Sequence, residues 1–235
     1  MASIPFTVYD VFAELAPGFI IIAVIDYVGN FRWILRADLP AWQALLWIGV
    51  AYIVGNVVSN VASWLYEFRF INLLGRSEKV LMTAVLTDVA SNSVEQPHKM
   101  GLHLSWRRVF PGYFRPLPAE TQQAVLRRYA LAPDSEWRAV FLAAFGTVKT
   151  IESVGARLNV FVTNYGFARN ASLACLIAAV VLLLLGTHNQ GSPAAWWAIA
   201  SLAASVGLLY RYLKFYRQYT YEVFLSYAVT GSGAP

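Results

Sequence analysis

The stretch A-W-Q-A-L-L-W-I-G-V-A-Y-I-V-G-N-V-V-S-N-V-A-S-W-L-Y, residues 41–66, decides the fold because it contains no charged side chain. A helix needs about 20 mostly apolar residues to cross a bilayer, and this stretch exceeds that length. Of the 235 residues in the chain, 58% are hydrophobic and 13% are charged, about half the charged share of an average soluble domain. We therefore expect an integral membrane protein.

Further stretches are apolar enough to be expected as membrane-spanning helices; they are residues 11–29, 168–187 and 194–210. The first of them is the least regular, because it contains Glu14, Asp26 and a Pro17-Gly18 pair that would kink a helix. The sequence thus predicts an all-α fold with four crossings in two transmembrane hairpins. The hairpins belong to residues 1–67 and 168–235, and residues 68–167 form a helical insert between them.

Basic residues predict the orientation of these crossings. Lys and Arg are in excess in the insert, and Arg211, Lys214 and Arg217 follow the fourth stretch. The loop at residues 187–193, T-H-N-Q-G-S-P, has no fixed charge, although two arginines follow the first stretch. By the positive-inside rule, the insert and both termini should face the cytoplasm.

A hydrophobic seam runs through the end of the insert. Apolar or small residues recur there in alternating steps of four and three: Trp137, Phe141, Ala144, Val148, Ile151, Gly155, Leu158, Val162 and Tyr165. Such spacing is typical of coiled-coil packing. No proline interrupts residues 134–187, so we expect one continuous rod-like helix through the third crossing. Shorter helices are expected at residues 77–90 and 118–131.

The expected neighbour of this seam is the aromatic continuation of the fourth crossing, residues 210–227. The short loop between the third and fourth crossings would bring both extensions out of the membrane side by side. Two arrangements remain open. Either the two helices pack within one chain as a hairpin extended into the cytosol, or one seam faces a symmetry-related copy.

The second crossing carries a stripe of small residues at intervals of four, which lets another helix approach closely. Its members are Ala51, Gly55, Ser59 and Ser63, and Asn56 and Asn60 lie beside it one turn apart. A carboxamide in hydrocarbon needs a hydrogen-bond partner. The stripe and the two asparagines therefore predict either helix-packing contacts or the polar lining of a pore.

Glu14 and Asp26 are the acids that could lie at membrane depth, where an acid usually marks a pairing, a cavity or an ion path. With the crossing at residues 11–29 both approach the interfaces. With a crossing at residues 15–35, Asp26 would be central. We favour the first placement. A transport or lipid-modifying protein would require one of these acids.

Residues 105–116, S-W-R-R-V-F-P-G-Y-F-R-P, interleave aromatic and basic side chains; Trp106, Arg107, Arg108, Tyr113 and Arg115 are the candidates for binding. Such a pattern suits a single-stranded nucleic acid, an anionic membrane surface or an anionic small ligand such as a nucleotide. Because the segment is tied at both ends to membrane helices, the sequence favours a membrane-surface or subunit contact. An anionic ligand is the second choice, and nucleic acid is disfavoured.

Catalytic chemistry has no motif in the sequence. The chain lacks a Gly-rich phosphate loop, G-x-S-x-G and H-E-x-x-H. The spacing of His98 and His103 suits no common metal site, and Cys175 lies in an apolar run that predicts a buried thiol. We expect no enzymatic activity, no cofactor and no metal.

Three short segments carry a resemblance to a known group: E-L-A-P-G-F-I-I-I at 14–22, A-Y-I-V-G-N at 51–56 and Y-G-F-A-R-N-A-S at 165–172. They resemble segments of uncharacterised bacterial four-pass inner-membrane proteins, some of which are membrane effectors in anti-phage defence. The resemblance covers the membrane segments and implies a location in the bacterial inner membrane.

The function we expect is that of an oligomeric membrane effector or channel-like protein. Its cytoplasmic helices would couple a ligand or partner signal to the membrane spans. The alternative is a membrane-anchored scaffold that recruits a cytosolic protein and has no pore activity. The partners expected are the lipid bilayer, further copies of the chain and a cytosolic protein or anionic small molecule.

Overall fold

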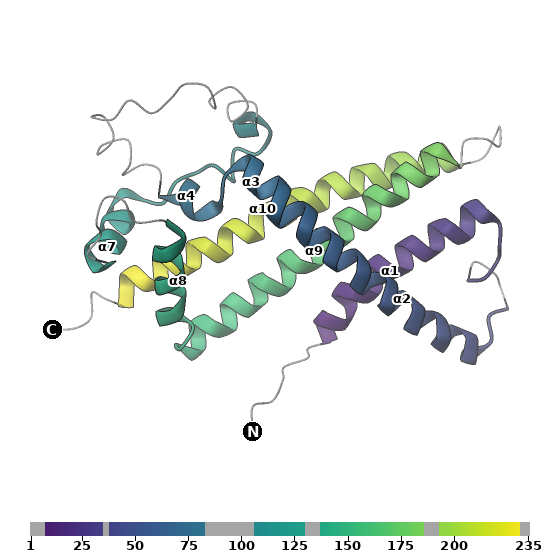
Figure 1. The fold of residues 1–235 in the computed structure, drawn as a ribbon, viewed down its shortest axis with the longest axis horizontal. Helices are drawn as coiled ribbons and strands as arrows, with labels where there is room; N and C mark the ends of the chain where they lie inside the picture. The colour runs from purple at the N-terminus through teal and green to yellow at the C-terminus, as the bar shows by residue number, and fades with distance from the viewer. Residues whose placement is uncertain (1–7, 35–37, 83–105, 130–136, 186–192, 231–235) are drawn as a thin grey trace. The chain divides into compact units, whose positions relative to one another are not determined.

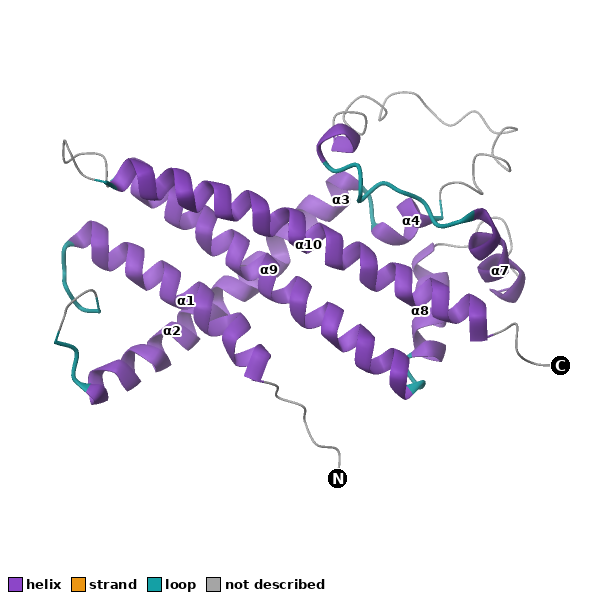
Figure 2. Ribbon diagram, turned by 180° about the vertical axis from the view of Figure 1, so that it is seen from behind, coloured by secondary structure: helices purple, strands orange, loops and turns teal. Residues whose placement is uncertain are grey.

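The computed structural model describes residues 8–34, 38–82, 106–129, 137–185 and 193–230. Within these ranges the chain is helical and contains no strand, which confirms the predicted all-α class (Figures 1 and 2). Two helical stretches, Ala41–Leu81 and Glu152–Leu184, are long and apolar enough to cross a membrane by length and composition.

The chain divides into two compact units. Unit 1 contains residues 1–69 and 163–212, and unit 2 contains residues 70–162 and 213–235. The sequence suggested three consecutive parts, and unit 1 contains residues of the first and the last of them. Unit 2 combines most of the insert with the C-terminal tail.

Unit 1 is built from long helices, drawn from purple to yellow-green in Figure 1. They are α1 (Val8–Gly29), α2 (Ala41–Ala62), the π-helix η1 (Ser63–Phe70), the later part of α9 (Glu152–Leu184) and the earlier part of α10 (Ala194–Thr230). α9 and α10 run side by side, with Leu182 packed against Ala194 and Ala198.

Helices α1 and α2 cross with their backbones in direct contact. A Cβ atom added to Gly18 would lie 1.8 Å from the carbonyl oxygen of Ala51, and one added to Gly55 would lie 1.8 Å from that of Glu14. Ala51 is fully buried at the same crossing. Ala51 and Gly55 of the small-residue stripe therefore face α1, and the glycine at position 55 permits the close contact.

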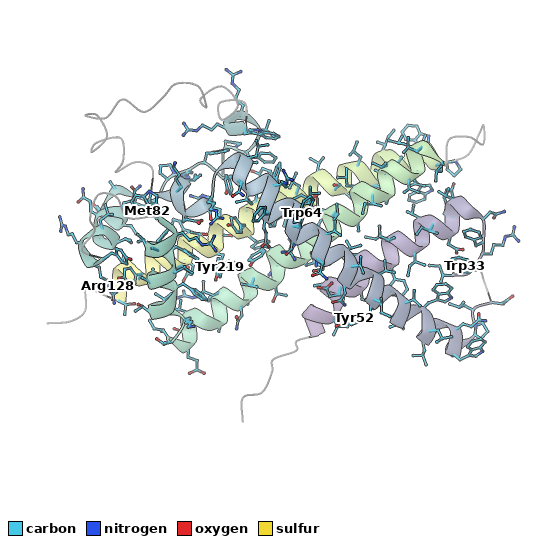
Figure 3. All side chains as sticks on the ribbon, in the orientation of Figure 1. Trp33, Tyr52, Trp64, Met82, Arg128 and Tyr219 are labelled. Carbon is cyan, nitrogen blue, oxygen red and sulfur yellow. The ribbon has the colours of Figure 1, made fainter. Side chains whose placement is uncertain are left out.

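Unit 2 has its own hydrophobic core. Its elements are α3 (Ile71–Leu74), α4 (Ser77–Leu81), α7 (Ala119–Tyr129), α8 (Trp137–Val148), the start of α9 and the end of α10. The buried members of this core are Leu81, Met82, Leu117, Val125, Val140, Ala144, Val148, Val154, Leu158, Val223, Phe224 and Tyr227. The side chains of Met82, Arg128 and Tyr219 mark this unit in Figure 3.

The prediction of one continuous helix through residues 134–187 is wrong. α8 ends at Val148 and α9 begins at Glu152; residues 130–136 and 186–192 lie outside the described ranges. At the break the Thr150 hydroxyl donates to the carbonyl of Thr147 at 2.7 Å, and the Thr147 hydroxyl donates to that of Ala143 at 3.0 Å. Threonine hydroxyls that bond to nearby carbonyls compete with the helical pattern, and β-branched residues weaken it further.

The seam residues nevertheless enter the core of unit 2. Val148 and Leu158 are buried, and Trp137, Phe141 and Ile151 pack against the buried residues. Val162 of the seam is 39% exposed, and Val140 and Val154 are buried although they lie off the seam. The spacing of four and three thus predicted part of the buried face, which two helices supply. The spacing of hydrophobic residues indicates which face of a helix is buried. The same spacing can continue across a short break in the helix when the helices on both sides pack against the same core.

The aromatic tail of α10 packs against these helices within one chain. The rings of Phe141 and Phe224 lie 5.9 Å apart edge to face, and those of Phe145 and Tyr219 lie 6.2 Å apart. Ser77 and Thr220 share a buried hydrogen bond of 2.6 Å. The intrachain arrangement predicted for the tail is therefore present, while a seam between copies stays a prediction.

Some of the residues singled out in the sequence fall outside the described ranges. They are His98, His103, His188 and the continuation of the helix predicted at residues 77–90 beyond Met82. The second short helix, predicted at residues 118–131, corresponds to α7.

Candidate functional site

A polar segment interrupts the apolar sequence of α9 inside unit 1. Arg169, Asn170 and Ser172 are 9%, 2% and 0% exposed. The residues around them on α9 are apolar and also buried, among them Ala168, Ala171 and Leu173. Polar side chains in such surroundings need hydrogen-bond partners, because an unpaired buried polar group is costly.

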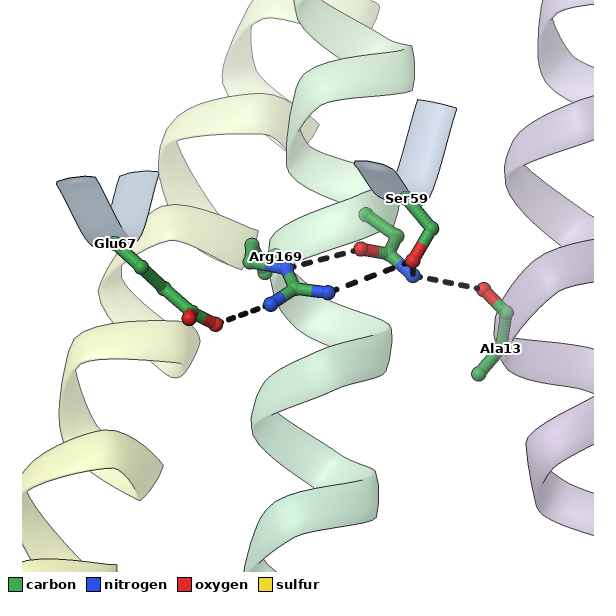
Figure 4. Close-up of polar contacts among 5 residues, drawn as sticks. Ala13, Ser59, Glu67 and Arg169 are labelled. Carbon is green, nitrogen blue, oxygen red and sulfur yellow. Dashed lines mark hydrogen bonds and ion pairs between the residues drawn. The ribbon is translucent and has the colours of Figure 1, made fainter. Parts of the chain in front are cut away.

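Arg169 finds its partners on two other helical segments. Its Nη1 atom pairs with the Glu67 carboxylate of η1, and its Nε donates to Asn170 Oδ1 at 3.1 Å. The second terminal nitrogen, Nη2, lies 3.5 Å from Ser59 Oγ of α2. Figure 4 shows the guanidinium reaching from α9 to Glu67 on one side and Ser59 on the other. The buried positive charge is thus compensated within unit 1.

Asn170 continues these contacts to α1. Its Nδ2 donates to Ser59 Oγ at 3.0 Å and lies 3.5 Å from the carbonyl oxygen of Ala13 (Figure 4). The Glu14 carboxylate follows directly on α1; it interacts with the Ser59 hydroxyl and with the charge of Arg169. Glu14 Oε2 is buried without a hydrogen-bond partner among the described residues.

Ser172 extends the contacts to α10. Ser172 Oγ donates to the carbonyl oxygen of Ser205 and Ser205 Oγ donates to that of Ser172, both at 2.9 Å. The Tyr66 hydroxyl lies 3.0 Å from Ser172 Oγ. We call the connected residues the polar layer; they are Glu14, Ser59, Tyr66, Glu67, Arg169, Asn170, Ser172 and Ser205. This layer links α1, α2, η1, α9 and α10.

The π-helix η1 explains how one short segment supplies two residues of this layer. Its i→i+5 hydrogen bonds widen each turn, so consecutive side chains are rotated by less than in an α-helix. Tyr66 and Glu67 can therefore both reach α9, the first towards Ser172 and the second towards Arg169. π-helical turns occur frequently at functional sites, which makes this segment the most informative part of the layer.

The outer surface of unit 1 is apolar. Large apolar side chains there include Leu45 at 69% exposure, Ile53 at 64%, Leu184 at 65% and Trp196 at 75%. Contiguous exposed apolar surface of this kind marks a membrane or protein contact. Unit 1 thus has buried charge inside and exposed hydrocarbon outside, the reverse of the pattern in a soluble domain.

Asn56 and Asn60, which were predicted to line a pore or to mediate helix packing, are not part of the polar layer. Asn56 is half-buried, and its Nδ2 donates to the carbonyl oxygen of Tyr52 in its own helix at 3.0 Å. Asn60 is exposed, whereas Ser59 belongs to the layer and half-buried Ser63 begins η1. The two asparagines therefore present amide groups on the outer face of α2.

Asp26 has a defined partner in the loop after α1. It is 1% exposed, and its two carboxylate oxygens accept hydrogen bonds from the backbone N–H groups of Trp33 at 2.8 Å and Ile34 at 3.0 Å. The rings of Phe31, Trp33 and Trp47 stack beside it, and Figure 3 shows Trp33 in this connection. Asp26 thus orders the end of α1.

Replacing Asp26 by Ala should destabilise the loop and leave any ion flux through the membrane unchanged. Two backbone N–H groups would lose a charged acceptor, which costs about 1–3 kcal/mol each when the group stays buried. We expect a lower unfolding midpoint in mild detergent, with any membrane depolarisation per inserted molecule unchanged from that of the wild type. Loss of depolarisation at normal protein abundance would instead place Asp26 on an ion path.

The aromatic and basic residues of 105–116 separate into two groups. Tyr113 is buried, and its hydroxyl donates to the carbonyl of Gly75 at 2.8 Å; burial raises the pKa of this phenol well above its ordinary value. Trp106 is half-buried against Phe70. Arg107, Arg108 and Arg115 are exposed, so the basic side chains among these candidates are accessible for binding.

Arg169 and Glu67 were missed by sequence reasoning. A usable signal was present, because an ionisable residue within an apolar segment of membrane length marks a pairing or a functional site, and Arg169 lies within the stretch 168–187. Its partner could not be identified from the sequence, since Glu67 follows the charge-free stretch and looks like the first residue of a solvated loop.

Comparison with protein-family models, curated proteins and solved structures finds no match to this chain. Within the described residues, no group of three or more His, Cys, Asp or Glu side chains could hold a metal ion. The geometry of the polar layer is therefore the basis on which a function is inferred.

Proposed function

We propose that this protein is an oligomeric membrane effector or channel-like protein of a bacterial inner membrane. In this proposal α1, α2, α9 and α10 cross the bilayer with both termini in the cytoplasm, and unit 2 lies on the cytoplasmic side. The observation that carries the proposal is the reversed polarity of unit 1, which buries the Arg169 guanidinium beside half-exposed Glu67 and exposes leucine, isoleucine and tryptophan side chains.

The depth of the polar layer supports this placement. At about 1.5 Å per residue, Arg169 lies roughly 22 Å from the Leu184 end of α9, and Glu14 lies a similar distance from the Gly29 end of α1. Ser59 lies roughly 27 Å from the Ala41 end of α2. In a hydrocarbon core about 30 Å thick, the helix ends at Leu184, Gly29 and Ala41 would lie near the outer surface of the membrane. The layer would then lie in the inner half of the bilayer.

The layer provides a gate in this proposal. α9 and α10 each contribute residues to both units, so a rearrangement of unit 2 is transmitted along continuous helices to Arg169 and Ser205. A shift of α9 against η1 would separate Arg169 from Glu67 and leave the buried Arg169 charge unpaired inside the bundle. Water and anions would follow this charge, because an unpaired charge in hydrocarbon is costly.

The outer face of α2 suggests why several copies are needed. Asn56 and Asn60 lie there beside exposed apolar residues such as Val57 and Val61. An amide exposed to lipid gains from a partner in a neighbouring helix or from water in a path. We therefore place this face of α2 against another copy or along the central path of an oligomer.

Replacing both Asn56 and Asn60 by Leu tests this proposal against the scaffold alternative. Overproduction in a bacterial host raises the concentration of oligomer, and the wild-type protein should depolarise the membrane, as a potential-sensitive dye would report. The Asn56→Leu, Asn60→Leu variant should depolarise it by roughly an order of magnitude less at equal abundance, because the polar face is removed.

The matched control replaces Val57 and Val61, two exposed apolar neighbours on the same helix, by Leu; this variant should behave as wild type. If wild-type protein never depolarises the membrane, or if the double asparagine variant remains fully active, the scaffold alternative is favoured. Topology is tested separately by reporter fusions at Gly112 and Gly191, which should report opposite compartments.

A further inference from the structure

Unit 2 contains a groove between the connection that precedes α7 and the C-terminal part of α10. Its lining residues are Arg115, Pro116, Leu117 and Pro118 on one side and Arg217, Gln218 and Tyr221 on the other. The cavity volume is about 570 Å³, which is enough for an organic phosphate rather than for a macromolecule.

The groove is held by hydrogen bonds around Leu117 and by one that the Arg217 guanidinium itself donates. The Leu117 N–H donates to the carbonyl of Leu81 at 2.9 Å, and Gln122 Nε2 donates to the carbonyl of Leu117 at 2.7 Å. Arg217 Nη2 donates to the backbone carbonyl of Arg115 at 2.6 Å. Prolines on both sides of Leu117 restrict the backbone further. The two sides of the groove are therefore fixed before any ligand arrives.

The charge of the groove is positive and uncompensated by the described residues. No carboxylate among them lies within ion-pair distance of Arg115 or Arg217, and Arg217 Nε is buried without a hydrogen-bond partner there. Burial lowers the pKa of the Arg217 guanidinium; the Tyr221 hydroxyl opposes this effect and the charge of Arg115 adds to it. Two like charges at one groove are stabilised by an anion between them.

Arginine pairs suit phosphate better than other anions. The planar guanidinium donates two parallel hydrogen bonds to phosphate oxygens, and a phosphate offers enough oxygens and charge for two arginines. The Tyr221 ring lies 5.7 Å from the Arg217 guanidinium carbon, which orients the guanidinium plane, and Gln218 adds an amide to the lining.

We infer that this groove binds a small phosphate-bearing anion through the guanidinium groups of Arg115 and Arg217. The anion is the free phosphate group of a soluble molecule or the headgroup of an anionic lipid, since both present the same chemistry. The role of this anion as a signal that opens a path through the membrane rests on the proposed function, whereas the binding of the anion to the groove does not. The aromatic and basic segment 105–116 thus contributes Arg115 to a site that α10 completes.

Calorimetric titration of inorganic pyrophosphate into the full-length protein in an uncharged detergent tests this inference without any flux measurement. We expect saturable binding, weakened about ten-fold or more by Arg115→Ala and by Arg217→Gln, since each removes charge-assisted hydrogen bonds. Lys214→Ala is the matched control: it removes one positive charge from an exposed position of the same helix, and binding should stay within about two-fold of wild type.

A second arm adds phosphatidylglycerol to the micelles. Competition with pyrophosphate that requires Arg115 would identify a lipid headgroup as the source, and absence of competition would identify a soluble phosphate. Arg115→Ala retains the backbone carbonyl that Arg217 contacts, so its effect is separable from misfolding of an Arg217 variant. The inference is overturned by absence of saturable pyrophosphate binding to wild-type protein, or by an equal loss in Lys214→Ala.

Discussion

Replacing Arg169 by Leu should lower the unfolding midpoint in mild detergent by roughly 6–12 °C. We expect the free energy of unfolding to fall by about 3 kcal/mol, and each kcal/mol lowers the midpoint by about 2–4 °C in a chain of this size. The substitution removes the ion pair with Glu67 and the hydrogen bond to Asn170 Oδ1. Breaking a buried pair from one side costs about 3–5 kcal/mol. We take the lower end, because the Glu67 side chain is 41% exposed.

Arg157→Leu is the matched control for this prediction. Arg157 also lies on α9 and pairs with Glu222 at 3.0 Å; the Arg157 side chain is 59% exposed and that of Glu222 is 16% exposed. A pair whose guanidinium is in solvent contributes about 1 kcal/mol or less, so the midpoint should change by a few degrees at most. Equal losses in the Arg169 and Arg157 variants would contradict the special role of the polar layer.

A double variant separates the structural role of the pair from its role in gating. Arg169→Leu combined with Glu67→Leu leaves no unpaired charge, and replacing both partners of a buried pair by apolar groups is often neutral or stabilising. We expect the double variant to regain most of the lost stability and to remain unable to depolarise the membrane. Recovery of both properties would show that the pair has no part in gating.

Much of the fold could be predicted from the sequence, because buried or lipid-facing helices show long apolar stretches or apolar residues at regular spacing. The absence of charge in residues 41–66 predicted the α2 helix, and the seam from Trp137 to Leu158 predicted the core of unit 2. Both predictions depend on side-chain polarity alone. They required no knowledge of which helices are neighbours.

The features that sequence reasoning missed depend on neighbours or on local backbone competition. Ser59 and Asn60 are adjacent polar residues that point in different directions from α2, and the contact of Gly55 with α1 determines that Ser59 is the one that reaches the polar layer. The break after Val148 arises from hydroxyl-to-carbonyl hydrogen bonds within a helix-compatible sequence. The π-helix at Ser63–Phe70 likewise has no distinctive composition, so its two residues in the polar layer could not be foreseen.

Replacing Gly55 by Ala should force α1 and α2 apart, although the change adds a single methyl group. The added Cβ would lie 1.8 Å from the carbonyl oxygen of Glu14 and 2.6 Å from its carbonyl carbon. Ordinary van der Waals contact begins near 3.4 Å, and the obstacle is backbone, so no side-chain rotation relieves it. Overpacking costs about 1–3 kcal/mol and occasionally more, and we expect at least the upper value here.

The separation would also reach the polar layer. Asn170 Nδ2 lies 3.5 Å from the carbonyl of Ala13, so a displacement of α1 by roughly 1.5 Å would break this contact and expose Glu14. Gly49→Ala is the matched control on the same helix, because a Cβ there meets nothing within 4 Å, and alanine is the better helix former. We expect Gly55→Ala to lose both thermal stability and depolarisation, with Gly49→Ala at or above wild-type stability. Similar stability of the two variants would show that α1 and α2 do not cross at Gly55, and the polar layer would then lose its contact with α1.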